Sequence, residues 1–598
     1  MCGIVAVFQT KPAITEQAIT VALDRIRYRG PDEQSIWCSD NSQVLLGHAR
    51  LSIIDPSYGQ QPLHNKENTL HAVVNGEFYN YKSIRRELCK KGYRFTSHSD
   101  SEILIALYQA YGVACLEYLD GEFAFVLYDQ SKQLLFAARD RFGVKPLFYT
   151  QYNNTLYFAS EIKAILALGV PAIWNQSMII TRGMFTEDET FFKSIVAIKP
   201  AHYLLADHTS CKALQSINYW QIGFTEEYAS TEHSFEIVSQ TLVQLLEQSI
   251  SQRLIADVPV ASYLSGGIDS CIVYLLATKL LDKPIPAFTI AFEQKSIDES
   301  DTVKHITQQT GGEHHLLTIS EQAICQHYPQ AVYHAESTLA NSNSVARFCL
   351  SEYANKLGFK CVLTGDGSDE LFAGYSYFQI KTEQDVTIPR ILQIQHSLNK
   401  QLEAFYTDDY AHQKMNSEFL FYNTLTKLTG DNPSLSGLAL SQWVSIKLMF
   451  HNYIVSRVGE RMDMAHAIET RLPFLDRKVA EFACRLPNVF KYHNGKEKIL
   501  LNHAFKDLMP KAIVEKQKHG FRGPSANFNN PRSPLNQFYG DILHSEVLGN
   551  IPLIDKKKVL TYYQKLPKSS HIQYPIADIL LNTIVSLCLL QQQFSLSN

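Results

Sequence analysis

The pattern of apolar residues changes near residue 230, and this change constrains the fold more than any other feature of the sequence. Residues 1–205 contain short apolar or alternating runs typical of strands, such as GIVAVF, HAVVNGEFYN and FAFVLYD, with helical stretches near 16–27 and 101–111. From residue 232, amphipathic helices alternate with the short apolar runs VPVASYL, IPAFTIAF and KCVLTG, which predicts a parallel sheet. A chain of 598 residues also exceeds what one core holds. We therefore predict an α/β protein with a domain at 2–205, a linker at 206–230 and a second domain at 231–598.

The composition excludes several classes of protein. The net charge is −4, so we expect no nucleic-acid partner and no attraction to an anionic membrane. The eleven cysteines are scattered and contain no C-x-x-C pair, which argues against a disulfide framework and a zinc site and favours a reducing cytoplasm. No N-terminal stretch has the pattern of a signal peptide. Polar residues interrupt the apolar stretch from Ile576, so we predict a buried packing helix there.

Cys2 directly follows the initiator methionine, and two explanations are open. Its position can be accidental, since the chain has ten other cysteines. Alternatively, removal of Met1 would leave a thiol and a free α-amine on one residue. The amine titrates near ~7.7–8.0 and can serve as a base for the thiol. N-terminal nucleophile hydrolases use this combination of a nucleophile and its own α-amine as the base.

The segment SYLSGGIDS, residues 262–270, lies between a predicted strand and a predicted helix. Gly266 and Gly267 allow a tight turn, and the helix N-terminus offers free N–H groups, so the loop suits an anion such as phosphate. Asp269 would repel phosphate unless a metal bridges them, which indicates Mg²⁺ on a pyrophosphate. The competing explanation is a Gly-Gly turn followed by a helix-capping aspartate.

Three more charged clusters follow. LTGDGSDELFAGY places Asp366, Asp369 and Glu370 after the strand KCVLTG, at the edge where doubly wound sheets bind ligands. ETRLPFLD carries Glu469, Arg471 and Asp476, and GKEKILL carries Lys496 and Lys498. Each can reach the nucleotide crevice, and lysines there would offset phosphate charge. Taken one at a time, simple solvent-exposed charge explains them equally well.

In sum, these segments resemble the glutamine-dependent asparagine synthetases over nearly the whole chain. MCGIVAVF, RYRGPDE, GHARLSIID, VVNGEFYNY and ARDRFGVKPLFY resemble the glutaminase domain of that family, and LSGGIDS, TGDGSDELFAGY, ETRLPFLD and KEKILL resemble its synthetase domain, in the same order. The resemblance implies an N-terminal αββα sandwich of antiparallel sheets. It also implies a C-terminal doubly wound parallel sheet of the adenine-nucleotide hydrolase type with added helices.

For the first domain, the resemblance implies that Cys2 attacks the glutamine carboxamide and releases ammonia. Asn75 and the N–H of Gly76 would form the oxyanion hole. Arg50 would hold the glutamine α-carboxylate, and Glu77 and Asp100 its amine end.

For the second domain, the resemblance implies that ammonia arrives through an internal tunnel and that ATP activates the aspartate β-carboxylate as an acyl adenylate. It implies binding of ATP and pyrophosphate by Leu264, Ser265, Gly266, Gly267, Asp269, Ser270, Ile290, Thr364 and Gly365. Asp366 and Lys498 would be catalytic, and Mg²⁺ would be held through pyrophosphate by Asp269, with a weaker contribution from Asp369. A homodimer is expected on resemblance alone.

Three departures from the family pattern leave the acceptor open. Asp366 stands where many members have Glu, and Asp463 where a small hydroxyl residue is common; the segment around Glu336 and Ser337 also differs. The alternative is that both half-reactions serve another carboxylate, such as a natural-product or cell-wall precursor. A non-catalytic glutamine or nucleotide sensor is a further alternative, although none of the chemical groups expected in the sequence is missing.

Overall fold

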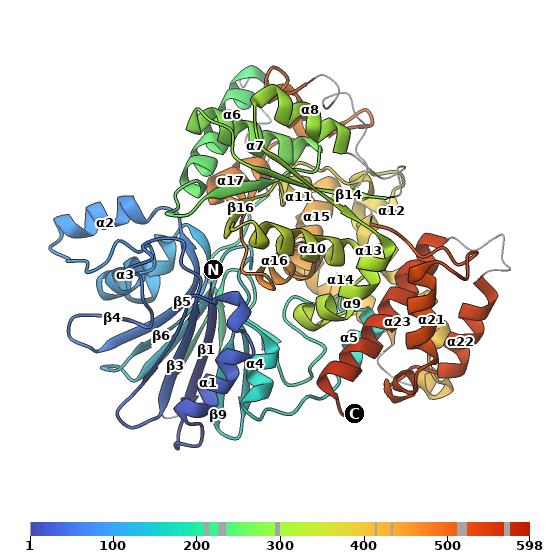
Figure 1. Cartoon of the computed structure of the whole chain (residues 1–598), viewed down its shortest axis with the longest axis horizontal. Coiled ribbons are helices and arrows are strands. Elements are labelled where there is room, and N and C mark those ends of the chain that lie inside the picture. The colour runs from blue at the N-terminus through green and yellow to red at the C-terminus, as the bar shows by residue number, and fades with distance from the viewer. Residues whose placement is uncertain are drawn as a thin grey trace.

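The computed structural model describes residues 2–207, 215–224, 235–293, 300–412, 416–431, 434–510, 513, 523–566 and 574–598. A strand-rich body formed by the first third of the chain lies against a larger body of helices and strands formed by the rest (Figure 1).

Two antiparallel sheets stack face to face in the first body. One has the order β10-β8-β9-β1-β3-β2 and the other β12-β11-β7-β6-β5-β4. Their strands are β1 (Gly3–Gln9), β2 (Glu33–Cys38), β3 (Val44–Arg50), β4 (Leu63–His64), β5 (Leu70–Phe78), β6 (Gly121–Asp129), β7 (Leu134–Arg139), β8 (Phe148–Tyr152), β9 (Thr155–Ala159), β10 (Val196–Ala197), β11 (His202–Asp207) and β12 (Ser216–Asn218).

Successive side chains of each strand point to opposite faces of its sheet, and this alternation forms the layers of the sandwich. In β1, Ile4 and Phe8 face the core between the two sheets, whereas Val5 and Val7 face the other side. That outer side is covered by α1 (Glu16–Asp24), α4 (Ile162–Ala167) and α5 (Gln176–Thr181). The second sheet is covered by α2 (Tyr81–Lys90) and α3 (Ile103–Tyr111). The predicted αββα sandwich is therefore confirmed.

A parallel sheet of order β15-β14-β13-β16-β17 forms the centre of the second body. Its strands are β13 (Val260–Tyr263), β14 (Ala287–Phe292), β15 (His314–Ile319), β16 (Cys361–Leu363) and β17 (Glu469–Arg471). The chain runs outward from β13 in one direction and resumes at β16 on its other side. In doubly wound sheets ligands bind at such a reversal, so we expect the nucleotide crevice at the carboxyl ends of β13 and β16.

Helices cover both faces of this sheet, so the doubly wound prediction is also confirmed. One face packs on α6 (Phe235–Arg253), α7 (Ile268–Leu281) and α8 (Ser300–Thr310), and the other on α10 (Asn343–Lys356). The added helices include α9 (Glu321–Ala335), α11 (Ser368–Leu371), α12 (Gln384–Thr387), α13 (Arg390–Leu402), α14 (Ser417–Asp431), α15 (Gly437–Val444), the π-helical segment Ser445–Glu460, α16 (Arg461–Met464), α17 (Arg477–Arg485), α18 (Asn488–Lys491), α19 (Ile499–Ala504), α21 (Pro534–His544), α22 (Lys556–Lys565) and α23 (Tyr574–Phe594). A hairpin of β18 (Tyr492–His493) and β19 (Lys496–Glu497) precedes α19.

The apolar C-terminal helix packs inside the protein. Among the described helices, α23 alone is long and apolar enough to cross a membrane by length and composition, and 72% of that stretch is buried. Its polar residues are paired there: Asn582 Oδ1 accepts from the Tyr328 hydroxyl at 2.7 Å, and Ser586 Oγ accepts from the Leu339 N–H at 3.1 Å. These pairs explain how an interrupted apolar stretch serves as a core helix.

The predicted linker at 206–230 lies partly outside the described residues, since 208–214 and 225–234 are not described. Its described part includes β12, which pairs with β11 and extends the second sheet to Asn218. The boundaries at 205 and 231 remain predictions.

Two candidate active sites and the contact between them

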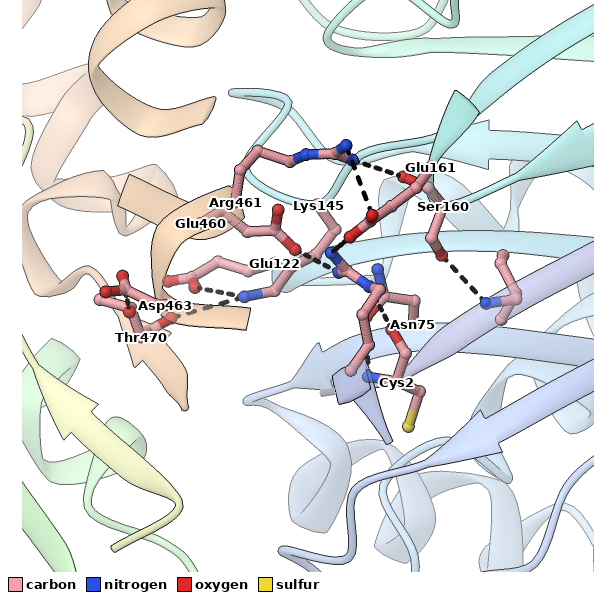
Figure 2. A network of polar contacts seen from close by, with 12 residues as sticks. Cys2, Asn75, Glu122, Lys145, Ser160, Glu161, Glu460, Arg461, Asp463 and Thr470 are labelled. Carbon is pink, nitrogen blue, oxygen red and sulfur yellow. Dashed lines mark hydrogen bonds and ion pairs between the residues drawn. The ribbon is translucent and has the colours of Figure 1, made fainter. Parts of the chain in front are cut away.

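Cys2 lies at the start of β1 against Asn75 of β5 (Figure 2). The Cys2 N–H donates to Asn75 Oδ1 at 3.0 Å, and the Cys2 carbonyl accepts from Arg29 Nε at 3.1 Å. Within the described part of the chain, the buried Nδ2 of Asn75 has no hydrogen-bond partner. A buried, unused donor beside a nucleophile suits an oxyanion. Burial raises the pKa of the Cys2 thiol, while the Leu51 N–H and the Arg50 guanidinium act in the opposite direction.

Gly76, the other predicted oxyanion donor, follows Asn75 in the same strand. Its φ is +146°, and a Cβ there would lie 2.1 Å from the Glu122 carbonyl oxygen. Only glycine therefore allows β5 and β6 to approach closely at this point. The strand thus holds Gly76 next to Asn75, whose side chain contacts Cys2.

The predicted glutamine-binding residues gather around the same pocket. Arg50 is buried, and its guanidinium donates to the carbonyl oxygens of Asp55 at 2.6 Å and Pro56 at 2.9 Å. Asp100 accepts from the Phe78 N–H at 2.9 Å, and burial raises its pKa to about 6. Burial and the neighbouring Asp100 raise the pKa of Glu77 well above its usual range. The site thus combines the buried Arg50 with two carboxylates, Asp100 and Glu77, whose pKa values are raised.

Glu469 and Arg471 correct one sequence expectation. Both are completely buried, so solvent-exposed charge is the wrong explanation for them. Arg471 pairs with Glu469 at 2.7 Å and lies 3.3 Å from Glu77, so this pair faces the Cys2 pocket rather than the nucleotide crevice. Sequence reasoning missed this role, because β17 belongs to the other domain and only the folded structure brings it to β5.

Asp476 and Lys496 also lie away from the crevice. Asp476 caps α17 by accepting from the Lys478 N–H at 3.0 Å, and Lys496 is exposed in the hairpin before α19. For Lys496 the exposed-charge explanation holds, and Asp476 serves as a helix cap.

The Ser-Gly-Gly loop has the predicted strand–turn–helix form. Ser265 and Ser270 hydroxyls lie 3.1 Å apart, and the Ser270 hydroxyl also accepts from the Ser265 N–H at 3.1 Å. Gly266 adopts φ +77°, and Gly267 caps α7. This arrangement points backbone N–H groups of the helix start toward the loop, as a phosphate site requires.

Asp269 is not a helix cap but part of a buried ion cluster. Lys498 Nζ contacts Asp269 Oδ2 at 2.5 Å and Asp369 Oδ1 at 2.6 Å, and the Ser368 hydroxyl donates to Asp269 Oδ1 at 2.6 Å. Lys498 is 2% exposed. The structure thus joins the Ser-Gly-Gly loop, the turn after β16 and the start of α19.

The remaining predicted nucleotide residues lie on the two neighbouring strand ends. The Leu264 N–H donates to the Phe288 carbonyl at 2.9 Å, which brings it beside β14 and Ile290. The Thr364 N–H donates to the Arg471 carbonyl at 3.1 Å. A Cβ on Gly365 would lie 2.7 Å from both Asp269 Cβ and Ser270 N, so the turn after β16 packs directly on the start of α7.

Asp366 lies in the same turn, in contact with an arginine that the sequence did not single out. Arg347 of α10 donates to Asp366 Oδ2 at 2.8 Å and binds Asp463 through Nε and Nη2 at 2.8 to 3.1 Å. The Ser351 hydroxyl also donates to Asp463, which is completely buried. Two of the three departures from the family pattern, Asp366 and Asp463, therefore meet on Arg347 in one ion cluster.

A buried network connects the two domains behind Cys2 (Figure 2). Arg29, which holds the Cys2 carbonyl, pairs with Glu161 at 2.8 Å and with Glu460. Arg461, next to Glu460, pairs with Glu336 and donates to the Ser160 carbonyl at 3.1 Å. Arg29 belongs to the segment RYRGPDE noted in the sequence, and Glu460 and Arg461 shortly precede Asp463.

The two halves match known families. Residues 1–220 match the glutamine amidotransferase domain, and residues 241–588 match asparagine synthase. The two sites and two folds therefore define a two-domain, glutamine-dependent amidotransferase. The chain belongs to the asparagine synthase family.

Three curated relatives cover nearly the whole chain. Amidase chry2 of Gibberella zeae is 31% identical over 93% of this chain and 93% of its own length. Amidase chyE of Penicillium rubens is 31% identical over 92% and 90%. Asparagine synthetase 3 of Bacillus subtilis is 30% identical over 87% and 86%. Family membership makes this chain a ligase that uses ATP and glutamine to form amides.

Proposed function

We propose that the chain hydrolyses glutamine at Cys2 and delivers the ammonia to an acyl adenylate formed on the Ser-Gly-Gly loop. The observation that carries the proposal is the buried, unpartnered Nδ2 of Asn75 beside Cys2, among the described residues. A structural asparagine would pair this donor, whereas a catalytic one holds it ready for a developing oxyanion.

In the first half-reaction, the Cys2 sulfur attacks the carboxamide carbon of glutamine. Asn75 Nδ2 and the Gly76 N–H bind the oxyanion, the C–N bond breaks, and ammonia leaves with the proton from the thiol. Water then hydrolyses the thioester to glutamate. Arg50 binds the glutamine α-carboxylate and Asp100 its α-ammonium.

In the second half-reaction, an acceptor carboxylate oxygen attacks the α-phosphorus of ATP and pyrophosphate leaves. Lys498 and the N–H groups at the start of α7 neutralise the pyrophosphate charge. Ammonia then attacks the acyl carbon, AMP leaves, and the nitrogen loses one proton.

The residues fit Mg²⁺, because Asp269 and Asp369 offer two hard oxygen donors that meet at Lys498. Asp269 and Asp369 would hold the ion, which supplies charge neutralisation for the pyrophosphate when bound.

Aspartate is the acceptor that we propose first, with asparagine as its product, because the resemblance to asparagine synthetases spans 87% of the chain. A second candidate is another carboxylate. The observation that favours it is that Asp366 and Asp463, two of the departures from the family pattern, both bind Arg347. We retain a cytoplasmic location and a possible homodimer as proposals.

One pair of variants tests whether the two half-reactions take place at separate sites. Cys2→Ala should abolish glutamine-dependent amide formation and spare formation from ammonium, because the thiol serves only the first half-reaction. Asp269→Asn should spare glutamine hydrolysis and abolish ATP-dependent pyrophosphate release with either nitrogen source.

Amide product, glutamate and pyrophosphate are measured for each variant, with and without aspartate. Glutamine hydrolysis that persists in Cys2→Ala would refute the assignment of the nucleophile. Pyrophosphate release that does not increase with aspartate, together with the absence of asparagine, would remove aspartate as the acceptor.

A further inference from the structure

Asp55 is a buried aspartate in the loop that follows β3, and none of the proposed catalytic steps uses it. The residue is 8% exposed. Its carbonyl oxygen accepts a hydrogen bond from Arg50 Nη2 at 2.6 Å, and its carboxylate Oδ2 accepts from the His98 N–H at 2.7 Å. His98 belongs to the turn that leads to Asp100, so a single residue contacts both predicted ends of the glutamine site.

The backbone of Asp55 forms a tight turn against the Arg50 guanidinium. Its φ is +48°, in the left-handed region that aspartate and asparagine adopt more readily than other residues with a side chain. The Gly59 N–H donates to the Asp55 carbonyl at 2.9 Å, and the Tyr58 N–H donates to Asp55 Oδ1 at 3.2 Å. A Cβ on Gly59 would lie 2.5 Å from Arg50 Nη2. The turn therefore packs directly on the guanidinium and fixes its direction.

The synthetase domain anchors this turn through Asp257, which lies between α6 and β13. Asp257 Oδ2 accepts from the Asp55 N–H at 2.8 Å, and the Asp257 N–H donates to the Ile53 carbonyl at 2.9 Å. Ile53 also packs in one apolar cluster with Met464 and Ala467 of the second domain. Two hydrogen bonds and an apolar contact thus hold the loop on the synthetase domain.

We infer that Asp55 is a positioning residue for glutamine, which fixes Arg50 relative to Asp100 so that the α-carboxylate and the α-ammonium of one free amino acid are bound together. The inference rests on the roles proposed for Arg50 and Asp100. Asp55 acts through its neighbours, because each of its own polar atoms already has a partner in the described part of the protein. Its loss should weaken glutamine binding and leave the chemical step at Cys2 unchanged.

Asp55→Asn in the full-length enzyme tests this inference. Asparagine tolerates the same φ and keeps one acceptor oxygen, but its NH₂ group cannot accept a hydrogen bond. Either the Tyr58 N–H or the His98 N–H therefore loses its acceptor. Glutamate formation gives kcat and KM for glutamine. The rate at which iodoacetamide inactivates hydrolysis reports on the Cys2 thiol alone, because this reagent has neither an α-carboxylate nor an α-ammonium group.

In Asp55→Asn we expect KM for glutamine to rise about tenfold, which is the effect of losing one hydrogen bond to a charged group. The value of kcat, the rate of inactivation by iodoacetamide and amide formation from ammonium should stay within about twofold of the unmodified enzyme.

A second pair of variants tests the anchor from the other domain. Asp257→Ala removes the acceptor of the Asp55 N–H and should raise KM for glutamine about threefold. Asp257→Asn keeps an acceptor oxygen and should restore KM to that of the unmodified enzyme.

Asp385→Asn is the matched control. Asp385 of α12 is 4% exposed, and its carboxylate also accepts from two backbone N–H groups, those of Lys381 at 2.8 Å and Thr382 at 3.0 Å. It contacts neither site, so KM for glutamine should not change.

An unchanged KM in Asp55→Asn overturns the inference, and so does an equal rise in Asp385→Asn. If Asp55→Asn loses all activities together, the Asp257 pair decides, and an unchanged KM in Asp257→Ala then overturns the inference. Glutamine hydrolysis that persists in Cys2→Ala instead refutes the proposed function, whatever the Asp55 and Asp257 variants show.

Discussion

Burial decides which charge each carboxylate of the glutaminase pocket carries at a given pH. Asp100 is 4% exposed, and burial outweighs the hydrogen bond from the Phe78 N–H and raises its pKa to about 6. If Asp100 binds the α-ammonium of glutamine, only its ionised form does so.

The value of kcat/KM for glutamine hydrolysis should therefore fall about tenfold per pH unit below about pH 6. Asp100→Asn should lower kcat/KM and remove this limb of the profile. The same titration affects stability in the opposite direction. The pKa of Asp100 in the folded protein lies above the unfolded value of 3.8, so ionisation of Asp100 lowers the free energy of unfolding as pH rises from about 4 to 6. The difference in free energy of unfolding between Asp100→Asn and the unmodified enzyme should therefore shift in favour of the variant between pH 4 and pH 7. An acid limb that persists in Asp100→Asn would assign the titration to another group.

Asp366 gives the second prediction at this scale. We expect Asp366→Asn to slow single-turnover amide formation from ammonia by about 10²-fold while ATP binding changes little, if the carboxylate accepts a proton as ammonia attacks. Arg347 Nη1 lies 2.8 Å from Asp366 Oδ2, so the longer side chain of Asp366→Glu must displace this guanidinium, and we expect this variant to be impaired as well.

Rapid-quench measurement with ammonia supplied directly isolates this step from the glutaminase half. An unchanged rate in Asp366→Asn would leave Asp366 as a partner of Arg347 and Thr364 only.

At the scale of elements, the sequence predicted those strands that bury apolar side chains. The alternation in β1 and the short apolar runs of β13 and β14 were sufficient to find them. β17 is only Glu469–Arg471, three polar residues that are stabilised in the sheet by ion pairs, so no apolar pattern marks it. The cluster on Arg347 was likewise invisible, because its members come from three segments more than 15 residues apart.

The contact between the turn after β16 and the start of α7 gives a prediction for these elements. Gly365→Ala should abolish ATP-dependent pyrophosphate release, because its Cβ would lie 2.7 Å from Asp269 Cβ and Ser270 N and must push the two apart. Glutamine hydrolysis should remain near normal. Gly430→Ala in α14 is the control: nothing lies within 4 Å of its Cβ, and it should be neutral or stabilise by up to about 1 kcal/mol. Normal pyrophosphate release in Gly365→Ala would show that the loop tolerates displacement.

At the scale of the whole molecule, the two domains share buried polar and charged contacts as well as apolar ones, such as Leu51 and Ile53 against Met464 and Ala467. Lys145 of the first domain lies 3.4 Å from the Thr470 carbonyl of the second, and Glu122 accepts from the Leu472 N–H at 3.0 Å. Buried ion pairs are costly to break and add little to stability, which suits a contact that fixes geometry. The sequence of neither domain predicts these contacts, because each residue meets its partner only when the two domains pack together.

Arg471 provides the last prediction, because a residue of the synthetase sheet contacts the glutaminase pocket. Its guanidinium donates to the carbonyl oxygens of Arg253 and Ile255 at 2.7 Å each, pairs with Glu469 and lies 3.3 Å from Glu77. Arg471→Lys keeps the charge but cannot span these partners. We expect kcat/KM for glutamine hydrolysis to fall by about tenfold or more, with glutamine consumption as the measurement.

The control for Arg471→Lys is Arg477→Lys, which alters another arginine between the domains. The Arg477 side chain is 38% exposed, pairs with Glu481 at 3.0 Å and lies 3.9 Å from Asp120 of the first domain. Exposed pairs of this kind contribute about 0–1 kcal/mol, so this variant should hydrolyse glutamine normally. Equal losses in the two variants would mean that any disturbance of the domain contact harms hydrolysis. Unchanged hydrolysis in Arg471→Lys would show that Glu77 and Cys2 function without support from β17. A selective loss in Arg471→Lys would mean that docking of the synthetase sheet completes the glutaminase pocket, so glutamine hydrolysis would depend on the two domains being assembled.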